Sequence, residues 1–211
     1  AFYIISRDDL IKSKNRLSGN IRAYEMPEDT AVEIDEPEDF IMIESLMKRR
    51  NSRNTVKKPE IKMVLTDCDG CLTDGGMYYS ENGDELKKFN TKDGMAFKLL
   101  REHGILTGIV TGENVELNRR RVEKLKLDIY EPGCTDKVAC IKKICSERNI
   151  DINNVLYVGD DINDLGVLEM VGYGCTPADA INEVKKAAKY VTKAKGGEGV
   201  IREITDNIIF A

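Results

Sequence analysis

The segment Ile61-Lys62-Met63-Val64-Leu65-Thr66-Asp67-Cys68-Asp69-Gly70 decides the expected fold. Its apolar residues form a short run between Pro59 and Gly70, a pattern typical of a buried strand in a parallel sheet. Asp67 and Asp69 follow the carboxyl end of this strand, where open α/β sheets bind their ligands. Two like charges at such close range oppose each other's ionisation, and a hard cation such as Mg²⁺ relieves the repulsion. The segment therefore predicts a metal site at the centre of a parallel sheet.

The composition is that of a soluble chain with room for one full domain and part of another. The 211 residues include 41% apolar and 33% charged side chains, and the net charge is −5. An acidic chain is not expected to bind nucleic acid nonspecifically. We also expect no membrane insertion and no secretion, because the sequence shows neither a long apolar span nor a leader pattern.

Six cysteines are scattered at irregular spacings, which favours reduced thiols in a cytoplasmic protein. Cys68 and Cys71 form a C-x-x-C pair, for which a redox or zinc site is the alternative. No second pair and no histidine cluster accompanies it, so we favour ordinary thiols.

The chain divides into two expected parts, 1–55 and 56–211. In the first part, alternation over 31–35 predicts an edge strand with Glu33 and Asp35 on one face. Pro37 then begins an expected helix whose apolar residues follow the helical period. The polar residues 48–58 are expected to form a linker. A strand and a helix cannot bury a core by themselves, so residues 1–55 are expected to be the end of a larger domain.

Residues 56–211 alternate between strand and helix patterns, which predicts a doubly wound, Rossmann-like parallel sheet. A β-hairpin over 77–89 interrupts the alternation, because Asn82-Gly83 separates two short strand patterns. The expected strands are 61–66, 105–110, 128–130, 155–158 and 172–174. The expected helices are 93–102, 114–126, 136–148, 162–169, 178–188 and a last one after Gly196-Gly197.

Four groups of polar residues fall at strand ends or helix starts and should therefore meet at one sheet edge. They are Asp67-x-Asp69, Thr111-Gly112, Lys137 and Gly159-Asp160-Asp161-x-x-Asp164. Taken singly, each could be a turn, a surface lysine or a helix cap, but their conjunction in this order favours a site. No Ser-His-Asp set is available, because the only histidine, His103, ends an expected helix before Gly104.

These groups suit the transfer of a phosphoryl group, which needs a nucleophile, a proton for the leaving oxygen and neutralisation of the phosphoryl oxygens. Asp67 can attack phosphorus, and Asp69 can act as the general acid and base. Asp67, Asp160 and the carbonyl of Asp69 would bind Mg²⁺. Lys137 and Thr111 would hold the phosphoryl oxygens.

The motif Asp67-Cys68-Asp69-Gly70-Cys71-Leu72-Thr73-Asp74-Gly75 resembles the first motif of the haloacid dehalogenase superfamily of phosphatases. Thr111, Lys137 and Gly159–Asp164 are similar to its second, third and fourth motifs. The closest resemblance is to the capless branch that hydrolyses 3-deoxy-octulosonate 8-phosphate and its nine-carbon relatives. It implies that Asp161 and Asp164 support the metal and Lys137. It also implies a homotetramer built through the hairpin 77–89, whose apolar residues are unusual for an exposed hairpin. The alternative is that this hairpin packs on its own domain.

Substrate choice is expected to depend on Thr111-Gly112-Glu113. The octulosonate enzymes usually carry Arg at the position of Glu113, whereas the nonulosonate 9-phosphate phosphatases resemble this chain. Glu113 and Gly112 would contact the sugar, and Arg121 and Lys124 of a neighbouring subunit would bind its carboxylate. Arg119 and Arg120 are expected to lie on a solvated helix face.

Residues 15–40 resemble the end of an acylneuraminate cytidylyltransferase. The segments that carry the resemblance are Asn15–Asn20, Tyr24–Pro27 and Val32–Phe40. In that family the residues matching Glu33 and Asp35 lie near the Mg²⁺ of the CTP site, but the nucleotide-binding half is absent, so no nucleotidyl transfer is expected. The predicted function is a phosphatase of a sialic-acid-type 9-phosphate joined to a sugar-activating enzyme. The alternatives are an octulosonate 8-phosphate phosphatase and a catalytically silent tetramerisation module.

Overall fold

The computed structural model describes residues 4–22, 25, 34–53, 60–82 and 85–210. The chain forms two compact units, Ala1–Val56 and Lys57–Ala211. We describe each unit by itself.

The first unit contains two helices, α1 (Arg7–Ser13) and α2 (Pro37–Arg53). The sequence did not predict α1, although Ser6 caps it by accepting a hydrogen bond from the Asp9 amide at 3.1 Å. The helix predicted to begin at Pro37 is confirmed. It continues to Arg53, so the expectation of a linker from residue 48 onward is wrong for 48–53. Lys and Arg are good helix formers and can prolong a helix without an apolar stripe.

The edge strand predicted over 31–35 is not seen in its described part. Ile34 and Asp35 are not in a strand, and Ala31, Val32 and Glu33 lie outside the described residues. The Asp39 carboxylate instead accepts hydrogen bonds from the amides of Asp35 and Glu36, at 3.0 and 2.9 Å. These bonds satisfy amides at the start of α2 and turn the chain into the helix.

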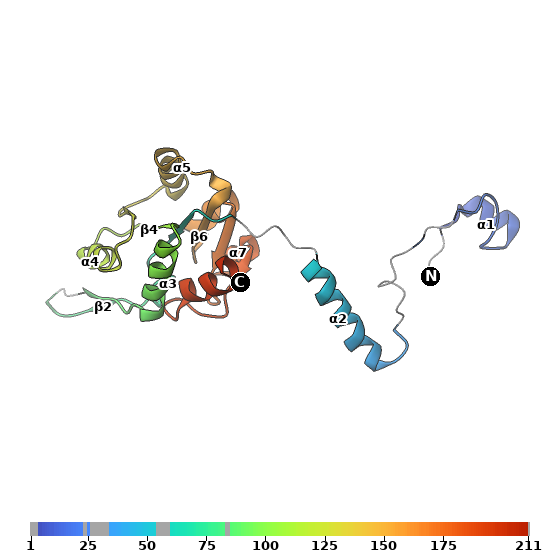
Figure 1. Ribbon diagram of the computed structural model, residues 1–211, viewed down its shortest axis with the longest axis horizontal. Coiled ribbons are helices and arrows are strands. Elements are labelled where there is room, and N and C mark those ends of the chain that lie inside the picture. Colours follow the sequence, from blue (N-terminus) through green and yellow to red (C-terminus); the bar gives the residue numbers. More distant parts are fainter. Residues whose placement is uncertain (1–3, 23–24, 26–33, 54–59, 83–84, 211) are drawn as a thin grey trace. The chain divides into compact units, whose positions relative to one another are not determined.

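The second unit is built on a six-stranded sheet in the order β5-β4-β1-β6-β7-β8, in which every neighbouring pair is parallel (Figure 1). This confirms the predicted doubly wound fold. The short strand β8 was not predicted from the sequence. The strands are β1 (Met63–Thr66), β4 (Leu106–Val110), β5 (Ile129–Glu131), β6 (Val155–Val158), β7 (Tyr173–Thr176) and β8 (Tyr190–Val191).

Helices cover both faces of this sheet, so the central strands are buried on both sides. Along β1, Val64 packs into one core with residues of α3, α4 and α8, and its neighbours Met63 and Leu65 pack into the other with residues of α5, α6 and α7. This explains why Met63, Val64 and Leu65 of β1 are apolar in succession. The helices are α3 (Thr91–Glu102), α4 (Glu116–Leu125), α5 (Lys137–Arg148), α6 (Leu165–Met170), α7 (Asn182–Ala187) and α8 (Val200–Ile204). Short turns are η2 (Ile152–Asn154), η3 (Ile162–Asp164) and the π-helical η4 (Thr205–Ile209).

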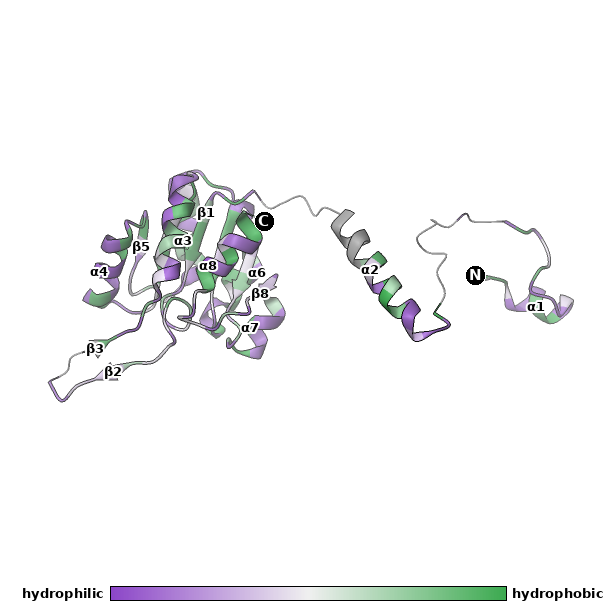
Figure 2. Cartoon of the chain, turned by 60° about the horizontal axis from the view of Figure 1, so that its bottom comes forward, coloured by the Kyte–Doolittle hydropathy of each residue, from purple (hydrophilic) through white to green (hydrophobic). Residues whose placement is uncertain are grey.

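The predicted hairpin is present as β2 (Tyr78–Tyr79) paired antiparallel with β3 (Glu85–Leu86). It projects from the body of the unit in Figure 1 and in Figure 2. Three of its apolar side chains are strongly exposed: Tyr78, Tyr79 and Leu86. The end of the expected turn, residues 83–84, lies outside the described residues.

The segment after β8 braces the loop that follows β1. A Cβ atom on Gly196 would lie 2.1 Å from the carbonyl oxygen of Gly70, so only glycine permits this approach. The Gly197 amide donates to the Cys71 carbonyl at 3.0 Å, and the Gly197 carbonyl accepts from Asn90 Nδ2 at 3.1 Å. The C-terminal segment therefore fixes the position of the loop that carries Asp67 and Asp69.

None of the helices in the described ranges is long and apolar enough to cross a bilayer. All six cysteines are free thiols in the structure.

Substitution of Phe97 tests whether the core on the α3 side of the sheet contributes to stability as the structure indicates. Phe97 is fully buried, so we expect Phe97→Ala to lower the free energy of unfolding by about 3–5 kcal/mol. The control Lys98→Ala removes an exposed side chain of the same helix and should change it by less than about 0.5 kcal/mol. Urea denaturation of the full chain followed by circular dichroism measures both. Equal stabilities of the two variants would contradict the assignment of this core.

Candidate active site

The residues predicted to form a site meet at the carboxyl edge of the sheet. Asp67 and Asp69 follow β1, Thr111 follows β4, Asp160 and Asp161 follow β6, and Lys137 is the first residue of α5. A pocket of ≈ 330 Å³ opens there. Its lining includes seven of the predicted residues, namely Asp67, Asp69, Thr111, Gly112, Glu113, Asp160 and Asp161.

Local structure sets the direction of these side chains. Asp136 caps α5 by accepting from the Ala139 amide at 2.9 Å, so Lys137 enters at the first turn. Gly70 has a φ of +75°, and a Cβ on it would lie 2.0 Å from Asp160 Oδ2. The glycine of the Asp-x-Asp-Gly motif therefore makes room for the carboxylate that follows β6.

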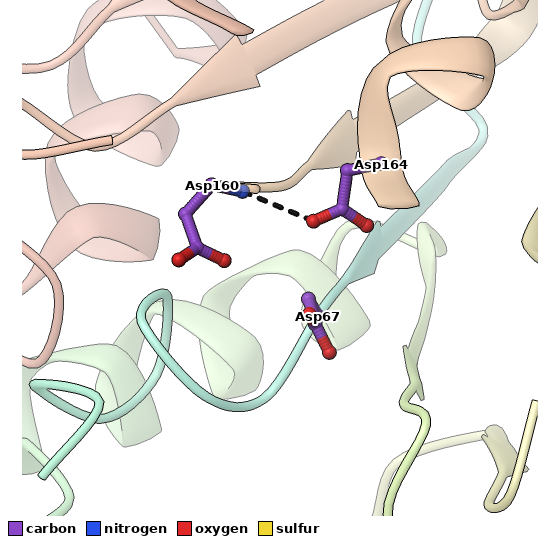
Figure 3. A group of neighbouring side chains, drawn as sticks. All are labelled: Asp67, Asp160 and Asp164. Atoms are coloured by element: carbon purple, nitrogen blue, oxygen red, sulfur yellow. Dashed lines mark hydrogen bonds between the residues drawn. The ribbon is translucent and has the colours of Figure 1, made fainter. Parts of the chain in front are cut away.

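Lys137 and Asp164 form the buried base of the site. Lys137 Nζ lies 2.8 Å from Asp67 Oδ2 and 2.7 Å from Asp164 Oδ1. The hydroxyl of Tyr157 donates to the same Asp164 oxygen at 2.6 Å, and the amide of Asp160 donates to Asp164 Oδ2 at 3.1 Å (Figure 3). Asp164 thus holds Lys137, as the family resemblance implies, and it also holds the loop after β6. Tyr157 was not predicted as part of the site, because a tyrosine inside an apolar strand gives no signal of its own.

Three carboxylates converge in this base. Ligand oxygens of Asp67, Asp160 and Asp164 all lie within 4.8 Å of one another (Figure 3). Burial, opposed by Lys137, raises the pKa of Asp67 to about 6. Burial together with the charges of Asp67 and Asp164 raises the pKa of Asp160 to about 7. One lysine cannot neutralise three carboxylates, so the cluster suits a divalent cation with oxygen ligands.

Asp67 and Asp160 are best placed to bind that cation, because both line the pocket, whereas Asp164 is fully buried behind it. The expected third ligand, the carbonyl of Asp69, belongs to the loop after β1, which also carries Asp67. Asp161 caps η3, and its side chain accepts from the Ile162 amide at 2.7 Å. Asp161 therefore shapes the loop that presents Asp160, and its expected support of the metal stays a prediction.

The carboxylate of Asp69 turns toward the hairpin side of the pocket. It accepts hydrogen bonds from Lys87 Nζ at 2.8 Å and from Thr73 Oγ1 at 3.2 Å. Lys87 also forms an ion pair with Glu113. The sequence did not identify Lys87, because nothing in a hairpin pattern shows that its last strand ends beside the loops after β1 and β4.

Two of the four predicted substrate-binding residues, Gly112 and Glu113, line the pocket. The other two do not. The guanidinium of Arg121 lies 4.9 Å from the centre of the Phe89 ring and donates to the Asn90 carbonyl at 3.0 Å. Lys124 is exposed on α4. Their contact with substrate bound to another subunit stays a prediction.

Several residues expected to have no catalytic role indeed lie elsewhere. His103 ends α3, with Nδ1 2.9 Å from the Leu99 carbonyl and its ring against Phe210. Arg119 and Arg120 pair with acidic neighbours on the exposed face of α4. Burial raises the pKa of the Cys68 and Cys71 thiols, which argues against thiolate chemistry by the C-x-x-C pair.

The sequence matches the family of haloacid dehalogenase-like hydrolases over residues 117–204. It is 35% identical over 161 residues to the 3-deoxy-D-manno-octulosonate 8-phosphate phosphatase KdsC of Escherichia coli K12, a match covering 76% of this chain and 86% of that protein. The enzyme of the same name from Haemophilus influenzae is 33% identical over 155 residues, which cover 74% of this chain and 86% of the enzyme.

Solved structures are similar as well. The octulosonate phosphatase of Moraxella catarrhalis, in complex with magnesium, phosphate and the octulosonate sugar, superposes with a TM-score of 0.71 at 29% identity. This match covers 73% of the present chain and 88% of that one. The cobalt-bound enzyme of Haemophilus influenzae gives a TM-score of 0.70 at 32% identity, covering 73% and 90%.

The pKa values of Asp67 and Asp160 predict how magnesium and pH act on stability. Both lie above the ordinary value of 3.8, so the metal-free folded state retains protons that the unfolded state has released. Its stability should therefore fall as pH rises from about 4 to 7. Mg²⁺ requires the ionised carboxylates, so 10 mM MgCl₂ should raise Tm by several degrees at pH 8 and hardly at pH 5.

Thermal unfolding with MgCl₂ or EDTA measures this effect. Asp160→Asn should lose the magnesium shift and, in EDTA at pH 8, should unfold at a higher temperature than the unsubstituted chain. A magnesium shift of the same size in both proteins would show that the ion binds elsewhere.

Proposed function

Because the chain belongs to the haloacid dehalogenase-like hydrolases and is a magnesium-dependent phosphatase of a sugar phosphate, we propose that its substrate is a nonulosonate 9-phosphate. Such a substrate is a nine-carbon acidic sugar of the sialic acid type, either deaminated or N-acylated. The observation that carries the proposal is Glu113, a carboxylate at the pocket wall where an arginine is expected in octulosonate enzymes.

Magnesium, held by Asp67, Asp160 and the Asp69 carbonyl, would neutralise negative charge on the carboxylates and on the phosphoryl group. Lys137 donates two hydrogen bonds to Asp67 and Asp164 and keeps a third N–H for a phosphoryl oxygen. The hydroxyl oxygen of Thr111 accepts from the Glu113 amide at 3.2 Å, so its proton is available to a second phosphoryl oxygen.

In the first step, a carboxylate oxygen of Asp67 attacks phosphorus and the bond from phosphorus to the sugar oxygen breaks. Asp69 gives its proton to that leaving oxygen, and an aspartyl phosphate remains. In the second step, Asp69 takes a proton from water, which attacks phosphorus and releases phosphate and free Asp67. The side chain of Asp69 is 26% exposed and that of Asp67 is 11% exposed. The greater exposure of Asp69 suits a group that exchanges protons with the leaving group and with water in the pocket. The smaller exposure of Asp67 suits a nucleophile that is shielded from water.

The sugar would occupy the part of the pocket next to Glu113, whose carboxylate can accept hydrogen bonds from sugar hydroxyls. The second candidate substrate is 3-deoxy-octulosonate 8-phosphate, which the names of the curated relatives favour. Glu113 decides between the two in our proposal, because a carboxylate and an arginine bind opposite partners.

We further propose that the hairpin joins four copies of the chain. The exposed side chains of Tyr78, Tyr79 and Leu86 support an interface, because an apolar cluster of this kind is unfavourable in water. A catalytically silent assembly module remains the third candidate function. The pairing of Lys137 with Asp67, and the place of Asp67 and Asp160 in one pocket, argue against it.

Residues 1–55 are proposed to be the end of a cytidylyltransferase that activates the sugar after the phosphate has been removed. This assignment is supported by the sequence resemblance over 15–40, and Glu33 lies outside the described residues. The six free thiols are compatible with a reaction in the cytoplasm.

Phosphate release from a panel of sugar phosphates separates the candidate functions. We expect turnover of a nonulosonate 9-phosphate in the presence of Mg²⁺ and slower turnover of the octulosonate 8-phosphate. Asp67→Asn should reduce turnover at least about 10³-fold, because the amide cannot form the covalent intermediate. A preference for the eight-carbon substrate would refute the role of Glu113. No release from any member of the panel would favour the assembly function.

A further inference from the structure

Lys87 lies between two acidic residues of the pocket. Its Nζ atom is 2.8 Å from Asp69 Oδ2 and also forms an ion pair with the carboxylate of Glu113. The Lys87 side chain has no exposed surface, whereas the side chains of Asp69 and Glu113 are 26% and 35% exposed. A substrate in the pocket therefore touches the two carboxylates but not the ammonium group that links them.

The two carboxylates come from different parts of the sheet. Asp69 follows β1 and Glu113 follows β4, so nothing along the chain fixes the distance between them. Without a cation between them, two partly buried carboxylates would repel each other and turn apart. The ammonium group of Lys87 donates hydrogen bonds to both carboxylates and therefore holds both side chains.

We propose that Lys87 is a positioning residue. It holds the general acid Asp69 and the sugar-recognising Glu113 at a fixed distance from each other. This inference rests on the proposed function, from which it takes the roles of Asp69 and Glu113. It gives the hairpin a second role, because residues at its base complete the active site of their own chain. Recognition of the sugar and protonation of its leaving oxygen then depend on one shared contact.

The leaving group provides the test. A sugar alkoxide leaves poorly and needs the proton of Asp69, whereas p-nitrophenolate leaves without one. A general acid contributes about 10²–10⁴ in rate, and misplacing it should forfeit part of that factor. We expect Lys87→Met to lower kcat for the sugar phosphate about 10–100-fold and to raise its KM. For p-nitrophenyl phosphate, kcat should fall less than about threefold.

Two further variants serve as controls. Lys88→Met removes the neighbouring lysine, which is 64% exposed and pairs with Asp74 at 3.5 Å, and should leave both activities unchanged. Lys87→Arg keeps the cation and should restore most of the sugar phosphatase activity. The magnesium-induced rise in Tm verifies that each variant folds with an intact metal site.

A double-substitution cycle tests the link between the two carboxylates. If Lys87 acts through both carboxylates, the effects of Lys87→Met and Glu113→Gln should overlap. The product of the two single-variant fold-losses in kcat/KM should then exceed the fold-loss in the double variant. Independent losses would overturn the coupling.

Equal losses on both substrates, or no loss on either, would overturn the assignment of Lys87. Failure of the proposed substrate appears separately, in the unsubstituted chain. If that chain prefers the eight-carbon sugar phosphate, the ratio of variant to unsubstituted activity on that substrate still decides the role of Lys87. An unsubstituted chain that cleaves p-nitrophenyl phosphate but no sugar phosphate would contradict both proposals.

Discussion

Crowding of negative charge at the end of β1 is the constraint on which this structure depends. Asp67, Asp160 and Asp164 converge there, and Lys137 supplies one positive charge among them. Burial raises the pKa of Asp67, and burial together with the charges of Asp67 and Asp164 raises the pKa of Asp160. The excess of negative charge is the reason the site requires a divalent cation. The same cation then serves catalysis, because a phosphoryl group adds more negative charge to the same place.

The fold maintains this arrangement through buried contacts behind the pocket. Asp164 accepts hydrogen bonds from Lys137, from Tyr157 and from the amide of Asp160, so one carboxylate joins α5, β6 and the loop after β6. Gly196 packs against the loop after β1 from the other side. Loss of the Asp164 hydrogen bonds, or disruption of the packing at Gly196, would move Asp67 relative to Asp160 without altering either residue.

A second charged cluster occupies the outer part of the pocket. In this outer cluster one buried lysine side chain holds two partly exposed carboxylates, whereas in the inner cluster one lysine faces three carboxylates. The inner cluster can therefore bind metal and phosphate, whereas the outer one presents acidic oxygens to the polar groups of a sugar. This division explains how one open pocket can treat the two ends of a sugar phosphate differently.

The sequence by itself determined the parallel sheet, the strands β1, β4, β5, β6 and β7, and the residues Asp67, Asp69, Thr111, Lys137 and Asp160. These features follow from local patterns, because apolar runs mark buried strands and parallel strands place their carboxyl ends together. It failed for α1, which Ser6 caps, for the end of α2, where helix propensity prolongs the helix beyond its apolar residues, and for the two-residue strand β8. Only the tertiary structure revealed Tyr157 and Lys87 as parts of the site. Lys87 reaches Asp69 and Glu113 from the hairpin, and such contacts between separate segments leave no periodic trace in the sequence. Tyr157 lies only seven residues before its partner Asp164, but a tyrosine inside an apolar strand does not stand out from its neighbours.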